Sequence, residues 1–102
     1  MKLKITRSSG NVFRYPGFSD EEAEHLKIRS DLMVQVQKVI ASRGLKQAEA
    51  AKILQVTQPR VSELLRGRID LFSTDTLIDM LARLGVRVRF VLSPQKPRQQ
   101  AA

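Results

Sequence analysis

A chain of 102 residues, 42% of them hydrophobic, has room for one small domain with one core. The formal net charge of +8 favours a polyanionic partner, because basic residues that neutralise phosphates release condensed counterions, although charge alone fits a merely basic soluble protein equally well. The lack of cysteine excludes disulfides and thiolate metal sites, and no apolar run reaches the ~18 residues of a membrane span. We therefore expect a cytoplasmic protein with no membrane partner.

Residues 1–18 form a basic segment without an acidic residue; its charges are those of Lys2, Lys4, Arg7 and Arg14. β-Branched and aromatic residues across 3–15, interrupted by the polar stretch 8–11, predict a weak strand or hairpin, or an arm that orders on binding. The turn signal Pro16-Gly17 ends this N-terminal arm.

A long helix is predicted from Ser19 to Arg43. Ser19 and Glu22 have the spacing of a capping box, and Gly44 is placed to end the helix. The acids of its first turns suit the helix dipole. One apolar stripe runs along it, with Arg29 as a polar exception that we expect at the edge: Leu26, Arg29, Leu32, Met33, Val36, Val39 and Ile40. A break near residues 30–31 is an alternative, because Ser and Asp favour caps over helix interiors.

Residues 46–67 predict a short helix, a tight turn and a second helix. The first helix covers residues 47–54 and carries small alanines where the second must cross it. Thr57 is an N-cap candidate for the second helix, Pro59 fits its first turn, and Gly67 can end it. The residues spaced to bury the inner side of this corner are Leu54, Val56, Val61 and Leu64.

After a connection over residues 69–72, Ser73 can cap a further helix that ends at Leu84, with Phe72 and Leu77 at the spacing of a hydrophobic staple. The apolar stripe of this helix is formed by Leu77, Ile78, Leu81 and Leu84. Residues 86–92 alternate apolar and basic at their start, which predicts a strand. Its partner is the N-terminal strand, the same strand of a second subunit, or both.

The expected fold is mainly α, a compact helical bundle with a helix-turn-helix motif, an N-terminal strand or arm and a C-terminal strand used in dimerisation. The expected domain division is an arm over 1–18, a helix-turn-helix domain with its strand over 19–92, and a disordered tail over 93–102.

The outward side of the second motif helix has side chains suited to a DNA groove. Gln58 can pair with adenine, Ser62 can bond a base edge or phosphate, Glu63 can accept from cytosine N4, and Arg60 can reach guanine or the backbone. Pro59 lies on the same side. The expected phosphate-contacting residues are Arg43, Lys46, Gln47, Thr57, Arg66, Arg68 and Ser73. The alternative is a helical hairpin with an ordinary polar solvent face.

Residues 44–84 resemble the XRE (Cro/repressor-like) helix-turn-helix family, and residues 9–13, followed by Pro-Gly-Phe and the acidic helix, resemble its HigA-like antitoxin branch. The resemblance implies a homodimer on a palindromic DNA operator, often an autorepressor that also neutralises a ribonuclease-type toxin. It places Gln47 at a phosphate contact and Gln58, Pro59 and Ser62 at base-reading positions. Gln55 stands where the family usually has Gly, in a turn that commonly needs positive φ, at a cost of roughly 1 kcal/mol.

Nothing in the pattern favours an enzyme, a cofactor or a metal. His25 is the only histidine and lies among acids, while Asp75 and Asp79 share a helix face without an acid–base partner. Two functions remain: a sequence-specific DNA-binding repressor, or a protein-binding module that neutralises a toxin and binds DNA secondarily.

Overall fold

Four α-helices, a 3-10 turn and a two-stranded sheet make up the part of the chain that the computed structural model describes, residues 2–5 and 19–94. In chain order the elements are β1 (Lys2–Ile5), α1 (Asp20–Ser42), α2 (Gln47–Leu54), α3 (Gln58–Leu65), η1 (Ile69–Leu71), α4 (Thr74–Arg83) and β2 (Arg87–Phe90). The mainly helical fold class is confirmed, and both motif helices have the predicted bounds to within a residue.

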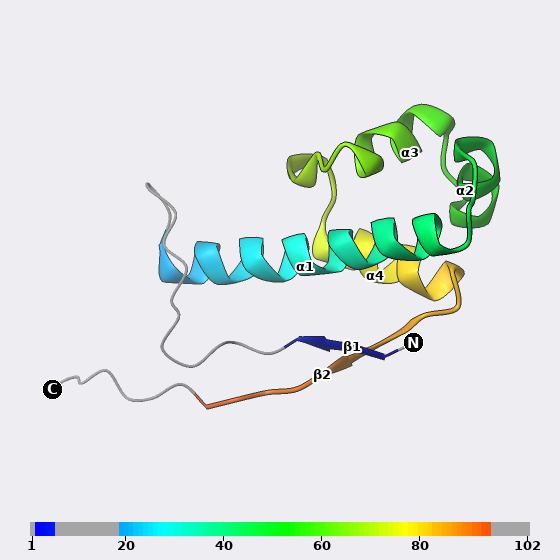
Figure 1. The fold of residues 1–102 in the computed structure, drawn as a ribbon. Helices are drawn as coiled ribbons and strands as arrows, with labels where there is room; N and C mark the ends of the chain where they lie inside the picture. The colour runs from blue at the N-terminus through cyan, green and yellow to red at the C-terminus, as the bar shows by residue number, and fades with distance from the viewer. Residues whose placement is uncertain (1, 6–18, 95–102) are drawn as a thin grey trace, which may run out of the picture.

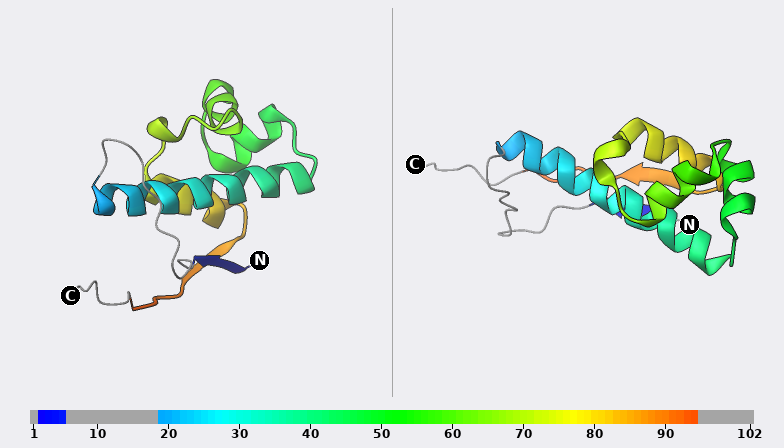
Figure 2. Two further views of the ribbon diagram at one scale, coloured as in Figure 1. Left: turned by 60° about the vertical axis from the view of Figure 1, so that its left-hand side comes forward. Right: turned by 90° about the horizontal axis from the view of Figure 1, so that it is seen from above.

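The elements are arranged in three levels (Figure 1). The long α1 and the shorter α4 pack together in the middle, with α2 and α3 on one side of them and the β1–β2 pair on the other. The left view in Figure 2, turned about the vertical axis, shows the same order. The motif helices and the sheet therefore occupy opposite sides of the molecule.

Helix α1 begins as predicted. The Ser19 hydroxyl accepts a hydrogen bond from the Glu22 backbone N–H at 3.1 Å, and the Glu22 carboxylate accepts from the Ser19 N–H at 2.8 Å. The alternative of a break near residues 30–31 is wrong, because the helix is continuous. Lys27, one turn earlier, places its Nζ 2.8 Å from Asp31 Oδ2. The Asp31 carboxylate is therefore engaged by Lys27 and does not compete for the hydrogen bonds of the helix backbone.

The core lies between α1, the motif helices and α4. Its buried residues are Leu32, Met33, Val36, Val39, Ile40, Ala50, Ala51, Leu54, Val61, Leu64, Phe72, Leu77, Met80, Leu81, Leu84 and Val86. The predicted stripes supply most of this set, although Leu26 and Ile78 are only half-buried and Met80 was not anticipated. Arg29 is half-buried, and its Nε finds no hydrogen-bond partner among residues 2–5 and 19–94.

All four α-helices end in the same way. A residue with positive φ, at the C-cap in α2 and directly after it in the other three, donates to the carbonyl three positions back, and the next residue donates to the carbonyl five positions back. This is the Schellman motif, which satisfies carbonyls that the helix leaves unpaired. The positive-φ residues are Gly44, Gln55, Gly67 and Gly85, with φ of 61°, 58°, 77° and 81°. The turn of the motif is thus retained with a glutamine in the left-handed conformation.

β1 and β2 pair in parallel, with Lys2 opposite Arg87 and Ile5 opposite Phe90. Of the partners left open by the sequence, this structure of one chain shows the N-terminal strand. β2 is shorter than the predicted 86–92, because β1 offers only four residues to pair with. The rest of the predicted arm, residues 6–18, and most of the predicted tail, residues 95–102, lie outside the described residues.

The single glutamine among these left-handed positions gives a stability prediction. We expect Gln55→Gly to stabilise the fold by about 0.5–1 kcal/mol, since relief of the left-handed strain exceeds the added entropy of the unfolded chain. Thermal unfolding followed by circular dichroism should show Tm rising by a few degrees.

The matched control is Gly44→Gln, which creates the same strain at another helix end. A Cβ at Gly44 meets nothing within 4 Å, so conformational strain alone should lower Tm there. A lower Tm for Gln55→Gly would contradict the prediction.

Candidate nucleic-acid interface

The α2–α3 corner is built on a small apolar interface. Ala50 and Ala51 are buried and let α3 approach α2 closely, and Leu54 closes the inside of the turn. On α3, Val61 and Leu64 are both fully buried. Of the four residues predicted from their spacing to form the inner side, Leu54, Val61 and Leu64 are buried, whereas Val56 is only half-buried. The opposite side of α3 is therefore turned away from the core.

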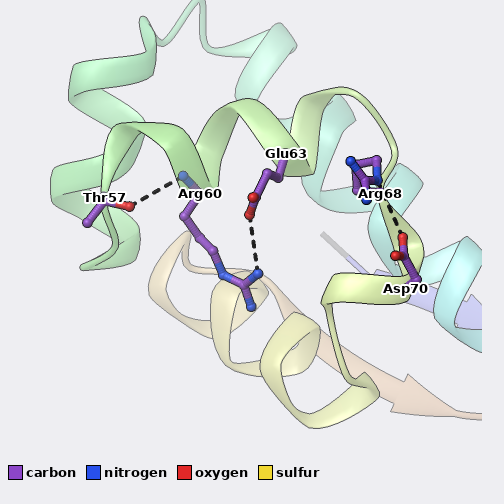
Figure 3. Close-up of polar contacts among 5 residues, drawn as sticks. All are labelled: Thr57, Arg60, Glu63, Arg68 and Asp70. Carbon is purple, nitrogen blue, oxygen red and sulfur yellow. Dashed lines mark hydrogen bonds and ion pairs between the residues drawn. The ribbon is translucent and has the colours of Figure 1, made fainter.

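Helix α3 is fixed at its start by a local cap. The Thr57 hydroxyl accepts a hydrogen bond from the Arg60 backbone N–H at 3.4 Å (Figure 3). Pro59 lies in the first turn, where its missing N–H costs nothing. Capping uses the hydroxyl oxygen as an acceptor, so the Thr57 O–H is still able to donate to an anion.

The end of α3 is fixed by a contact that the sequence analysis missed. Gln37 on α1 donates from Nε2 to the Leu64 carbonyl oxygen at 2.8 Å. This bond satisfies one of the last carbonyls of α3 and ties the helix to α1, 27 positions earlier in the chain. Its only signal in the sequence is a glutamine beside the apolar stripe of α1, which is too common a pattern to be informative.

The predicted base-reading residues are not equally accessible. Gln58 and Pro59 at the start of α3 are exposed, while Arg60, Ser62 and Glu63 are half-buried. The structure thus brings all five to one helix but gives Arg60 and Glu63 intramolecular partners.

Arg60 is engaged by the fold on two sides. Its guanidinium carbon lies 4.0 Å from the centroid of the Phe72 ring. On the other side, its Nη1 lies 3.4 Å from Glu63 Oε1, the contact drawn in Figure 3. Phe72 is buried between η1 and the start of α4, as predicted for a hydrophobic staple, but its contact with Arg60 was not predicted. A cation over an aromatic face is attractive by about 0.5–2 kcal/mol.

The predicted phosphate-contacting residues all lie at exposed positions: Arg43, Lys46, Gln47, Thr57, Arg66, Arg68 and Ser73. Arg68 Nε lies 3.5 Å from Asp70 Oδ1, with both side chains at least half exposed, so this ion pair is weak and easily exchanged (Figure 3). Ser73 caps α4 by accepting from the Thr76 N–H at 3.1 Å.

The start of α2 is an N-terminus without a side-chain cap. Lys46 stands at the N-cap, where its ammonium group has no acceptor to offer, and its own N–H donates to Glu49 Oε1 at 2.8 Å. Gln47 follows as the first helical residue. The positive end of this helix thus carries a lysine and an amide side chain at the surface, a combination suited to an anion.

Residues considered for other chemistry do not converge. His25 is exposed on α1, and Asp75 and Asp79 are exposed on α4. Within residues 2–5 and 19–94, no group of three or more potential metal-ligating side chains is found, and no helix there is long and apolar enough to cross a membrane.

Comparisons with known proteins agree with this geometry. A family model described as "Helix-turn-helix domain" matches residues 15–93. A solved structure named as an XRE-family transcriptional regulator is 35% identical, with a TM-score of 0.67 over 78% of this chain and 89% of that one. No curated protein matches the chain.

Proposed function

Because the chain belongs to the helix-turn-helix domain family, and within it to the XRE family, it is a DNA-binding regulator, and we propose that it is a sequence-specific repressor. We propose further that it binds a palindromic operator as a homodimer and regulates its own operon as an antitoxin.

The observation that carries the DNA-binding proposal is that α3 is held in one orientation by the rest of the fold. Its apolar side is fully buried at Val61 and Leu64, its start is capped by Thr57 and its end is held by Gln37. A helix fixed in this way presents a polar side of constant orientation, which groove recognition requires because base contacts are directional.

The outward-facing residues of the motif divide into two roles. Gln58, Pro59 and Ser62 are proposed to face base edges in the major groove, with Gln58 paired to an adenine. The exposed basic and hydroxyl residues around them are proposed to bind phosphates and so set the orientation of α3. The segment 43–68 supports this role, since it carries six basic residues against two acids.

Substitutions in the two sets should have different effects. We expect Gln58→Ala and Ser62→Ala to reduce discrimination between the operator and its single-base variants by about 1–3 kcal/mol each. Lys46→Ala should weaken binding to all sequences and lower the slope of log K against log salt by about 1. Fluorescence anisotropy titrations over a salt series measure both quantities.

Lys52→Ala is the matched charge control, because Lys52 is exposed on α2 and outside the proposed contact set. If Gln58→Ala left operator preference unchanged, this assignment of the reading side would be wrong.

The proposed homodimer uses β2. One edge of β2 pairs with β1, and a two-stranded sheet leaves the other edge with unpaired backbone groups. The apolar residues at its end are exposed, with Phe90 at 59% and Leu92 at 90%. A second β2 related by a two-fold axis would cover both features and would leave α3 free, since the sheet lies on the other side of the α1–α4 level.

Disruption of this edge should give a monomer. We expect the wild type to have twice the 11.5 kDa chain mass, and Phe90→Glu/Leu92→Glu to have the single-chain mass, because two charges would be buried in the interface. Light scattering after size exclusion measures the mass, and circular dichroism checks the fold. A variant that stayed dimeric would exclude this edge.

The antitoxin role is supported by the resemblance of residues 9–13 and by the apolar and basic composition of the N-terminal arm. Residues 2–5 are engaged with β2, so deletion of 1–18 would also unpair the sheet. The sharper variant is Val12→Ser/Phe13→Ser, which leaves β1 intact.

We expect this variant to lose co-purification with the product of the neighbouring gene while it retains operator binding. Undiminished co-purification would exclude these residues as the contact. If the wild-type protein bound its operator but co-purified with no product of the neighbouring gene, a free-standing regulator would be favoured.

A further inference from the structure

Arg60 and Glu63 differ in position on α3. Successive residues of an α-helix turn by about 100°, so Glu63 falls beside Ser62 on the side opposite the buried Val61, whereas Arg60 falls on the flank toward Phe72. Both side chains are 32% exposed. Glu63 is thus the residue of the pair that is turned more toward a bound groove.

Phe72 holds Arg60 in place. The ring is 2% exposed, and it is fixed by η1 before it and by the Ser73 cap of α4 after it. An arginine stacked on an immobile ring has little rotamer freedom left to lose on binding, so its guanidinium is a fixed positive charge beside α3.

Glu63 needs such a charge. It is the only acid within α3, and a carboxylate brought close to DNA phosphates is repelled unless a cation compensates it. Arg60 Nη1 contacts Oε1 of Glu63 and leaves Oε2 without this partner. The oxygen that remains is an acceptor of the kind that cytosine N4 can bond in the major groove.

We propose that Glu63 is the specificity-determining residue for one cytosine in each half-site, and that Arg60 is a positioning residue which acts through it. The Phe72 ring orients Arg60, and Arg60 neutralises and orients Glu63. This assignment rests on the proposed function and differs from a direct role of Arg60, in which its guanidinium would itself bond guanine or phosphate.

The two roles of Arg60 predict different base preferences. As a positioning residue, Arg60 has no base of its own, so its loss removes the same cytosine preference that the loss of Glu63 removes. As a direct reader, it would carry a separate preference for guanine, and its loss would leave the cytosine preference intact.

The experiment is a double-mutant cycle on base preference. Wild-type protein first selects its site from random duplex DNA, and affinities are then measured for that site and its single-base variants. We expect the wild type to prefer one cytosine by about tenfold, and Glu63→Gln, Arg60→Met and the double variant each to reduce this preference to below about threefold. Arg60→Lys should keep part of this preference, because an ammonium group can also lie over an aromatic face and pair with a carboxylate.

Phe72→Leu tests the ring separately, since it keeps an apolar side chain in the core and removes the aromatic face. We expect the same reduced cytosine preference as for Arg60→Met. Circular dichroism on every variant identifies any that do not fold, and Arg60→Met and Arg60→Lys alter no buried residue.

The outcomes separate the inference from the proposed function. If the wild type selects a site and Arg60→Met loses a guanine while it keeps the cytosine, Arg60 is a reader and the inference is overturned. Full cytosine preference in Phe72→Leu would overturn the role of the ring. Selection of a site without the cytosine overturns the inference alone, whereas failure to select any sequence overturns the proposed function with it.

Discussion

The burial of one side of α3 is the constraint on which the rest of the structure depends. An isolated helix of eight residues is unstable in water, because the cost of nucleation is not recovered over so few hydrogen bonds. Val61 and Leu64 provide the missing stabilisation by entering the core completely, and Thr57 and Gln37 satisfy the two ends. The same contacts that make α3 stable also fix its rotation about its axis, so the orientation of its polar side is a by-product of its folding.

The features that could be predicted from the sequence are those with local causes. Ser19, Thr57 and Ser73 cap helices as expected. The left-handed turn at Gln55 was implied by the family resemblance, in which this position is usually Gly. Contacts between distant segments were not predictable. Gln37 reaches Leu64 only because α1 and α3 are packed together, and Arg60 meets Phe72 only because η1 returns the chain beneath α3. The alternative of a break in α1 is wrong for a related reason, since the low helix propensity of residues 30–31 is outweighed by the ion pair of Asp31 and by the burial of the residues that follow. The roles of single side chains at DNA remain predictions.

The separation of the motif from the sheet decides what each can do. α2 and α3 lie on one side of the α1–α4 level and β1–β2 on the other, so an interface at the strands would leave the basic exposed residues around α3 unobstructed. The start of α2, which has Lys46 at its N-cap and no side-chain cap, belongs to the side of the molecule that is proposed to bind DNA. A side-chain cap there would stabilise the helix but would occupy N–H groups that an anion can use. Some helix stability is therefore given up where binding to phosphate is proposed.

The parallel pairing of β1 with β2 also has a consequence for the order of folding. Lys2 and Arg87 come from nearly opposite ends of the chain, whereas the contacts between α2 and α3 join neighbours in sequence. Closing so long a loop is entropically slow, and only a short run of parallel ladder stabilises it once closed. The helices can thus assemble first, and the strands join a scaffold that already exists. Opening of this strand pair would then be available to the native state without loss of the helical core.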